Sequence, residues 1–193
     1  MTINRPETFS LIKTYFGKLS QSQVDSFNLF FDEWDGKDKR HLAYILATVW
    51  HETNKTMLPI EEIGKGKGLR YGSRVWYDNK PYSDVPHIYY GRGYTQNTWR
   101  DIYLKLTKSN CMNWDFVNHP ELLLQVKPSI WATFYAMEKG LYTGKKLGHY
   151  FNGEKSDPIW ARSIINGKRK AEKLPDKAEL ICDYYNKFLN SIQ

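Results

Sequence analysis

The sequence lacks the features of several large protein classes. It has only two cysteines, Cys111 and Cys182, which are too few and too far apart for a tetrahedral metal site. Two thiols are compatible with a reducing compartment. No uninterrupted apolar run reaches the length of about 18 residues that a membrane span needs, and residues 1–10 have no signal-peptide core. We therefore expect a soluble chain that is made in a cytoplasm.

Common catalytic and ligand-binding motifs are missing as well. His51-Glu52 would begin the zinc-protease motif H-E-x-x-H, but Lys55 stands where the second histidine belongs. The sequence has no G-x-S-x-G of serine hydrolases, and the glycines of residues 64–68 fit neither the Walker nor the Rossmann spacing. The other histidines show no ligand spacing. The sequence therefore predicts no metal and no cofactor.

Positive charge is in excess, but it is not concentrated in blocks. The net charge of +7 and the pI of about 9.2 suit polyanionic surroundings such as nucleic acid, anionic lipid or a bacterial wall. The most basic runs, residues 65–74 and 168–173, are interrupted by other residue types. We therefore favour a solvated basic surface over a nucleic-acid stripe and expect no nucleic-acid partner.

Hydrophobic spacing predicts a mostly helical chain. Ser20 and Gln23 form a capping box that opens a helix ending near Gly36, and Asp38 caps the next one. Further helices are predicted at residues 98–106, 128–138, 146–151, 158–165 and 175–192. Residues 64–93 instead contain β-prone runs at 74–77 and 87–90 around a turn at 78–80, which predict a small hairpin lobe or an irregular insertion.

Glu52 is the residue that best indicates a function. It follows the apolar stretch 42–50, whose spacing is that of a buried helix face. Burial disfavours the charged form of a carboxyl group, which can raise its pKa and keep a proton available for donation. Glu52 is therefore predicted to be a general acid.

A partner for this acid follows nearby, as Glu61 and Glu62. A glycosidase needs an acid that protonates the leaving oxygen and a second carboxylate that acts as base or nucleophile. Either glutamate could supply that second group, and composition alone is equally consistent with two solvated loop residues. The aromatic share of 16%, which includes 7 Trp and 14 Tyr, suits stacking on sugars, although aromatic residues also fill helical cores.

Four blocks of residues occur in a distinctive order: Tyr44–Thr53, Met57–Glu62, Tyr89–Trp99 and Ile164–Gly167. The third block reads Y-Y-G-R-G-Y-T-Q-N-T-W, and the first ends in H-E-T. These blocks resemble the signature blocks of the family 19 chitinase-like glycoside hydrolases, within the lysozyme-like superfamily. Their order and spacing are most similar to the phage endolysin branch, and they span most of the chain.

The resemblance implies a mainly α, lysozyme-like α+β fold in which a helical lobe and a small β-hairpin element flank a cleft. It implies one catalytic domain over residues 1–193, with the β-containing lobe at about residues 64–93 and no separate wall-binding domain. The activity it implies is cleavage of β-1,4 bonds between amino sugars.

Site residues follow from position within the blocks. The resemblance makes Glu52 the general acid, Glu62 the base that activates water, and Thr98 a residue that helps to hold this water. The spacing from Glu52 is shorter than in plant chitinases, so Glu61 stays open as the base. Four further residues match positions that bind the sugar chain: Tyr90, Arg92, Gln96 and Asn166.

Two residues of the third block carry more specific expectations. Arg92 could bind Glu62 or Glu52 and lower the pKa of that carboxyl group, or it could fix the backbone of the cleft wall. Asn97 stands where the family usually has an apolar residue, so we expect its side chain to be more exposed than usual.

The predicted function is that of a peptidoglycan-degrading endolysin that aids lysis of a host cell. Chitin hydrolysis and lytic transglycosylase chemistry are the alternatives within the same fold. A non-catalytic wall-binding protein is disfavoured because Glu52 and a glutamate at 61 or 62 are both present. A nucleic-acid binder rests on net charge alone.

Partners and location are predicted from the same reasoning. The expected partner is bacterial peptidoglycan as substrate, and the chain is expected to be a monomer. It would be made in the host cytoplasm and act at the periplasmic cell wall. Since no signal peptide or transmembrane segment is evident, it would depend on a holin-type membrane protein. The host, the bond cleaved and the redox state of the two cysteines stay open.

Overall fold

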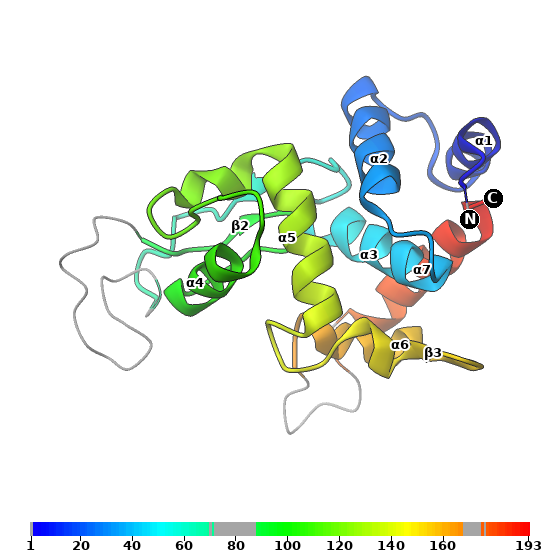
Figure 1. The fold of residues 1–193 in the computed structure, drawn as a ribbon. Helices are drawn as coiled ribbons and strands as arrows, with labels where there is room; N and C mark the ends of the chain where they lie inside the picture. Colours follow the sequence, from blue (N-terminus) through cyan, green and yellow to red (C-terminus); the bar gives the residue numbers. More distant parts are fainter. Residues whose placement is uncertain (1, 70, 72–87, 168–174, 176) are drawn as a thin grey trace. The chain divides into compact units, whose positions relative to one another are not determined.

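The structure is a computed structural model that describes residues 2–69, 71, 88–167, 175 and 177–193 (Figure 1). It is 56% helix and 5% strand, with small two-stranded sheets. The prediction of a mainly helical chain with a small β element is therefore confirmed. Among the described residues, no helix has the length and apolar character that crossing a membrane requires.

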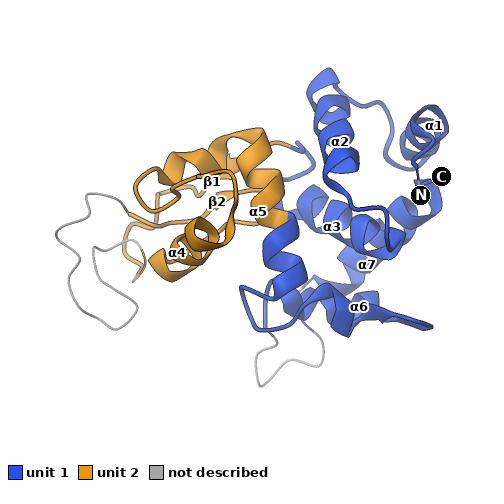
Figure 2. Ribbon diagram, in the orientation of Figure 1, with its two compact units in different colours: residues 1–57, 134–193 blue, residues 58–133 orange. Residues whose placement is uncertain are grey.

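The chain divides into two compact units, which are coloured separately in Figure 2. Unit 1 combines residues 1–57 with residues 134–193, and unit 2 consists of residues 58–133. The boundary falls within helix α5 (Val126–Lys139). The lobe predicted at residues 64–93 belongs to unit 2, but its β-prone run at 74–77 and the turn at 78–80 lie outside the described residues.

Unit 1 is a helical body built around α3 (Lys39–Glu52). This helix packs against α7 (Ala178–Ser191), and α7 also contacts α1 (Arg5–Phe16) and α6 (Pro158–Ala161) (Figure 1). Residues 42–50 of α3 are all buried. A helix that is apolar on every side is stable only when other elements surround it, which explains why α3 is central to this unit.

Local signals set the ends of these helices as predicted. Ser20 and Gln23 form the complete capping box of α2 (Gln21–Glu33), and the Asp38 side chain accepts a hydrogen bond from the Arg40 N–H at the start of α3. Each such cap contributes about 1 kcal/mol because it satisfies a helix N–H that lacks an intrahelical partner.

Aromatic rings fill the space between the helices of unit 1. The ring of Phe188 on α7 lies 4.5 Å from that of Phe16, 5.8 Å from Phe27 and 6.1 Å from Trp50. Full burial of one such side chain stabilises the folded state by about 1.5–3 kcal/mol. The aromatic excess of the sequence therefore serves the core at these positions.

Unit 2 contains a short antiparallel pair, β1 (Ile60–Glu61) and β2 (Arg92–Gly93). Ile60 is opposite Gly93, and Glu61 is opposite Arg92. The 3-10 helix η2 (Pro120–Leu124) contacts β2, and the helix α4 (Arg100–Ser109) follows the Tyr89–Trp99 block. Glu61, the alternative second carboxylate, therefore lies on a strand that is paired with the Y-Y-G-R-G block, and Glu62, the predicted one, follows that strand directly.

Two expectations about helices differ from the structure, and one helix was not expected. Residues 146–151 form a 3-10 turn, η3 (Leu147–His149), followed by β3 (Phe151–Asn152), which pairs with β4 (Lys155–Ser156) around Gly153 at φ 49°. Residues 158–165 form α6 and then the 3-10 helix η4 (Arg162–Ile164). Helix α1 was not predicted, because it buries only Thr8 and Ile12 and its apolar pattern is weak.

Candidate active site

Glu52 ends helix α3 and pairs with a buried arginine of unit 1. The Arg162 Nη1 atom donates to Glu52 Oε1 over 2.6 Å. The Arg162 side chain is 3% exposed and the Glu52 side chain 18% exposed, so solvent screens this pair only weakly. Burial disfavours a carboxylate charge, and the guanidinium opposes this by stabilising it. Arg162 was not among the residues predicted for the site.

A carboxylate at this end of a helix also faces the negative end of the helix dipole, which destabilises it further. Arg162 is therefore the group that stabilises the Glu52 carboxylate at this position. The arginine is the first residue of η4, and every residue from Ala161 to Ile164 is buried. An arginine within the mostly apolar run Ile159–Ile165 is the signal that sequence reasoning could have used, because a buried guanidinium requires a partner.

The turn after Glu52 is built by Thr53 and by non-glycine residues with positive φ. The Thr53 hydroxyl donates to Val49 O over 2.8 Å and accepts from the Met57 N–H over 3.1 Å. Asn54 and Lys55 have φ of 48° and 69°, a region that costs side chains of this kind about 1 kcal/mol each. The threonine of H-E-T thus ends the helix immediately after the candidate acid.

Asn166, predicted to bind substrate, also belongs to unit 1. Its backbone N–H donates to Arg162 O over 3.1 Å, and its side chain is exposed. The I-I-N-G block therefore begins two residues after the arginine that contacts Glu52, and the Asn166 N–H is bonded to that arginine's carbonyl. The structure brings together Glu52, Arg162 and the backbone of Asn166 within one unit.

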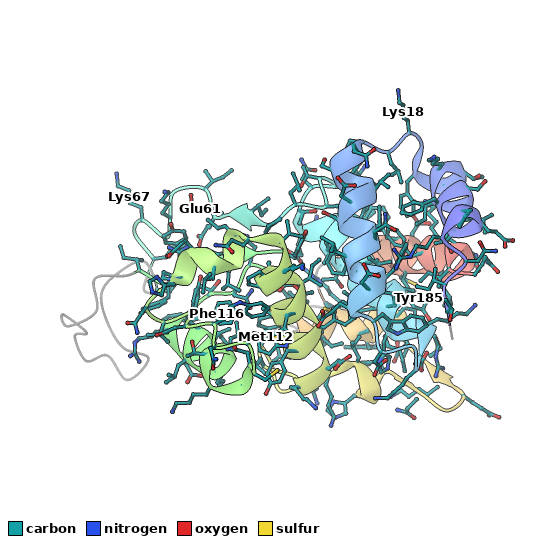
Figure 3. The ribbon with its side chains drawn as sticks, turned by 45° about the horizontal axis from the view of Figure 1, so that its top comes forward. Lys18, Glu61, Lys67, Met112, Phe116 and Tyr185 are labelled. Atoms are coloured by element: carbon teal, nitrogen blue, oxygen red, sulfur yellow. The ribbon has the colours of Figure 1, made fainter. Side chains whose placement is uncertain are left out.

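In unit 2, Glu61 accepts hydrogen bonds on β1. Its Oε1 accepts the Tyr90 hydroxyl proton over 2.5 Å, and its Oε2 lies 3.1 Å from Lys65 Nζ. The Tyr90 hydrogen bond, followed by Lys65 and Arg92, holds the pKa of Glu61 below its usual range. Glu61 is labelled in Figure 3, where the Lys67 side chain projects outward. Glu61 is therefore a stable carboxylate near neutral pH.

Glu62 is fixed by different partners. Its Oε2 accepts the Gly91 N–H over 2.9 Å, its Oε1 accepts the Tyr71 hydroxyl proton over 2.8 Å, and its own N–H donates to Gly91 O. Two of these three bonds involve backbone atoms. Both oxygens of Glu62 are thus engaged by groups of unit 2.

The contacts of Arg92 do not match the first of its two expected roles, which was to bind Glu62 or Glu52. It is 6% exposed, its guanidinium lies 3.6 Å from the centre of the Tyr90 ring, and its Nη1 donates to Ile88 O and the Tyr103 hydroxyl. Among the described residues, the arginine that pairs with Glu52 is Arg162, and the hydrogen bonds of Arg92 run to carbonyls and a hydroxyl. These contacts match the structural alternative, in which Arg92 fixes the backbone of its block.

Gln96 ties β1 to the block around β2. Its Nε2 donates to Ile60 O over 3.1 Å, and a Cβ at Gly91 would lie only 2.6 Å from its Oε1. A side chain at position 91 would therefore have to displace the Gln96 amide from this position. Because its amide donates to Ile60 O, Gln96 links β1 to the Tyr89–Trp99 block and is also a candidate ligand of the sugar.

Thr98 and Asn97 follow Gln96 in the same block and make local hydrogen bonds. The Thr98 Oγ1 donates to Gln96 O over 2.8 Å and is half-buried, so its lone pairs can still accept from a water molecule. Asn97 is 0% exposed, and its Nδ2 donates to Arg92 O over 3.2 Å. The expectation of a more exposed Asn97 was wrong, because its side chain is buried and its amide adds a second hydrogen bond to Arg92 O, which also accepts from the Asn97 backbone N–H.

The described residues that were predicted for catalysis do not line a pocket found in unit 1, and they do not form a metal site. No group of three or more His, Cys, Asp or Glu that could hold a metal ion occurs in the part of the chain that the structure describes. A pocket of about 270 Å³ in unit 1 is lined by residues other than those predicted for catalysis: Asp35, Lys37, Asp38, His41, Glu138, Lys139, Lys146, Leu147 and Gly148. Its Asp35 and Lys37 pair with each other over 2.8 Å.

Comparison with known proteins identifies the fold. No protein-family model and no curated protein sequence matches the chain. Among solved structures, chitinase C from Streptomyces griseus HUT6037 is similar with a TM-score of 0.61 and 15% identity, over 94% of this chain and 74% of that one. A bacterial family 19 chitinase has a TM-score of 0.56 and 16% identity, over 94% of this chain and 92% of that one. A mutant of chitinase C has a TM-score of 0.54 and 14% identity, over 94% and 88%.

At this level of identity the likeness concerns the fold. The mainly helical, lysozyme-like fold with a small two-stranded element, which the resemblance implied, is confirmed. The structural neighbours are family 19 chitinases, as the sequence blocks suggested, whereas the phage endolysin branch is not tested by these comparisons.

Proposed function

We propose that this chain is a glycoside hydrolase that cleaves β-1,4 bonds between amino sugars, with bacterial peptidoglycan as its substrate. The observation that carries the proposal is the partly buried contact of Glu52 with the buried Arg162 at the end of α3, in a chain with the fold of family 19 chitinases. A glutamate that costs stability at a buried helix end, and is held there by a buried arginine, is typical of a catalytic group.

Glu52 is the proposed general acid. Its Oε1 faces Arg162, so we assign proton donation to the other oxygen, Oε2. Departure of the leaving sugar oxygen requires this proton, and Glu52 becomes a carboxylate as the bond breaks. Arg162 then stabilises the carboxylate that forms, which is a positioning and electrostatic role.

The second carboxylate comes from Glu61 or Glu62. The sequence prediction chose Glu62, and this choice stays a prediction. The contacts favour Glu61 for binding a water molecule, because one of its oxygens faces only Lys65, an exposed side chain that can move away. Both oxygens of Glu62 face groups of the β1–β2 region or Tyr71. Thr98 would orient the water, and Gln96 and Asn166 would bind N-acetyl and hydroxyl groups of the sugar.

Stereochemistry tests this arrangement directly. A water-activating base gives inversion at the anomeric carbon, whereas a carboxylate nucleophile gives retention. Proton NMR of freshly formed product should show the α-anomer first. Initial release of the β-anomer would instead favour a nucleophilic carboxylate.

Peptidoglycan is the first proposed substrate and chitin the second. The basic surface of the chain suits an anionic wall, and the resemblance to phage lysins points the same way. Chitin is favoured by a different observation, since the similar solved structures are chitinases. An endolysin role would add action at the periplasmic wall of a host cell and dependence on a holin-type membrane protein.

Digestion of purified peptidoglycan and of chitin, followed by mass spectrometry, separates these candidates. Reducing muramic acid ends mark a muramidase, reducing glucosamine ends mark a glucosaminidase, and anhydro-muramic ends mark a lytic transglycosylase. We expect new reducing ends from peptidoglycan. Soluble products from chitin alone would transfer the proposal to the chitinase alternative.

A further inference from the structure

Trp99 is an exposed aromatic residue in a strained backbone position. Its φ of 72° and ψ of 135° lie outside the regions that bulky residues normally adopt. Its side chain is nevertheless 38% exposed, so burial of the indole in a core does not account for the strain. Strain of this kind persists only where the surrounding structure imposes it, and such positions cluster at ligand-binding sites.

The backbone around Trp99 is held firmly. Its N–H donates to Tyr89 O over 2.9 Å, and its carbonyl accepts from the Ile102 N–H over 3.0 Å as α4 begins. Tyr89 is fully buried. The indole is therefore presented to solvent from a rigid base, and a ligand that uses it loses little conformational entropy from the protein.

A second aromatic ring supports the indole. The rings of Trp99 and Tyr71 meet edge to face, with centroids 5.4 Å apart and an interplanar angle of 73°. A single neighbouring ring can cover at most one face of the indole. The T-shaped contact thus fixes the orientation of Trp99 and leaves aromatic surface available.

Tyr71 is in turn anchored to the carboxylate pair. Its hydroxyl donates to Glu62 Oε1 over 2.8 Å, and Glu62 Oε2 is held by the Gly91 N–H. Burial and this hydrogen bond raise the pKa of Tyr71 to about 12, so it stays a donor at any working pH. A continuous set of contacts therefore runs from the indole through Tyr71 to Glu62, the neighbour of Glu61.

We propose that Trp99, supported by Tyr71 and Glu62, is a stacking platform for one pyranose ring of an amino-sugar chain. The apolar C–H face of a pyranose packs on an aromatic face, and the polar rim of the sugar stays hydrated or hydrogen-bonded. This inference rests on the proposed glycoside hydrolase function. It adds a residue that sets the position of the sugar chain relative to Glu61 and Glu62. In this arrangement Glu62 is a positioning residue for the platform.

Binding without turnover tests the platform. The Glu52→Gln variant serves as the background, and isothermal titration with the tetrasaccharide of N-acetylglucosamine is the measurement. Adding Trp99→Ala should weaken affinity about tenfold, which is of the order expected for loss of one stacked ring. Trp99→Phe should retain most of the affinity. Unchanged affinity in Trp99→Ala would overturn the proposal.

Two further variants separate stacking from a structural role. Trp160→Ala removes a tryptophan of similar exposure, 37%, from α6 of unit 1 and should bind as the background does. Trp99→Gly relieves the positive φ, so its melting temperature should not fall while its affinity does. A variant that loses affinity only in proportion to lost folded protein would assign Trp99 to structure and contradict the platform.

The outcomes also separate the platform from the proposed activity. If the wild type hydrolyses its substrate and Trp99→Ala leaves both affinity and KM unchanged, the platform is wrong and the activity stands. If no substrate is turned over but Trp99→Ala still weakens oligosaccharide binding, the platform stands and the activity is wrong.

Discussion

Arg162 Nη1 lies 2.6 Å from Glu52 Oε1, although the two residues are 110 positions apart in the sequence. The contact joins the end of α3 to the start of η4 within unit 1. It links the H-E-T block to an arginine that lies two residues before the I-I-N-G block; these are the first and last of the four blocks that the sequence singles out. The candidate acid is thus defined by a partner as much as by its own position.

Removal of Arg162 should impair both stability and activity. Arg162→Met leaves Glu52 without its cation, and we expect unfolding free energy to fall by about 1–3 kcal/mol and activity by at least about 100-fold. Urea unfolding and wall-degradation rates measure the two effects. In the double variant with Glu52→Gln, the stability losses should be less than additive, because the neutral amide no longer needs a cation. Strictly additive losses would contradict a direct pair.

Single amide substitutions distinguish the two candidate bases. From the contacts of the carboxylates, Glu61→Gln should lower kcat about 100-fold or more with little effect on stability. Glu62→Gln should act more through stability, since it disturbs the bonds to Gly91 and Tyr71. Steady-state kinetics with thermal melts of both variants give the comparison. The reverse pattern, with catalysis lost only in Glu62→Gln, would restore the choice made from the sequence.

Gly93 should not tolerate a side chain. It has φ of 89°, and a Cβ there would lie 2.6 Å from Ser129 Oγ and 3.1 Å from Leu123 O. We expect Gly93→Ala to lower the unfolding free energy by about 3 kcal/mol, from combined backbone strain and overpacking. Gly148→Ala is the matched control, because nothing lies within 4 Å of its added Cβ. Similar denaturation midpoints for the two variants would show that the β2–η2 contact is looser than described.

Glu138 should make stability depend on pH in a defined direction. Burial, with a contribution from Asp35, raises the pKa of its carboxyl group. The folded state then binds the proton more tightly than the unfolded state, so stability falls as pH rises through the unfolded value near 4.3 towards the folded value. Glu138→Gln should therefore raise the melting temperature by about 2 °C at pH 7 and leave it unchanged at pH 3. Equal effects at both values would exclude this cause.

The helical fold and the location of Glu52 could be predicted because they depend on local patterns. The capping box at Ser20, the cap at Asp38 and the apolar stretch before Glu52 each act over a few residues. Helix α1 was not predicted, because its stability depends on packing against other elements and its amphipathic pattern is weak. The same limitation explains residues 146–151, where a turn at Gly153 and strand pairing take precedence over helical spacing.

The candidate site was only partly predictable. Arg162 is invisible to local reasoning, because its role depends on a residue 110 positions away. Asn97 was expected to be more exposed than usual because it replaces a residue that is usually apolar, yet its side chain is buried and donates to the Arg92 carbonyl. Trp99 and Tyr71 are ordinary aromatic residues in the sequence, and only the exposure and backbone strain of Trp99 and the contact between the two rings distinguish them.

The central claim is that Glu52 donates a proton to the glycosidic oxygen of an amino-sugar polymer. The most direct measurement is the release of reducing ends from purified peptidoglycan by the wild type, by Glu52→Gln and by Glu154→Gln, which alters an exposed carboxylate of the β3–β4 turn. We predict that Glu52→Gln keeps its helical circular dichroism and loses at least about 1,000-fold in rate, while Glu154→Gln matches the wild type. A folded Glu52→Gln variant that retains wild-type rates would contradict the account.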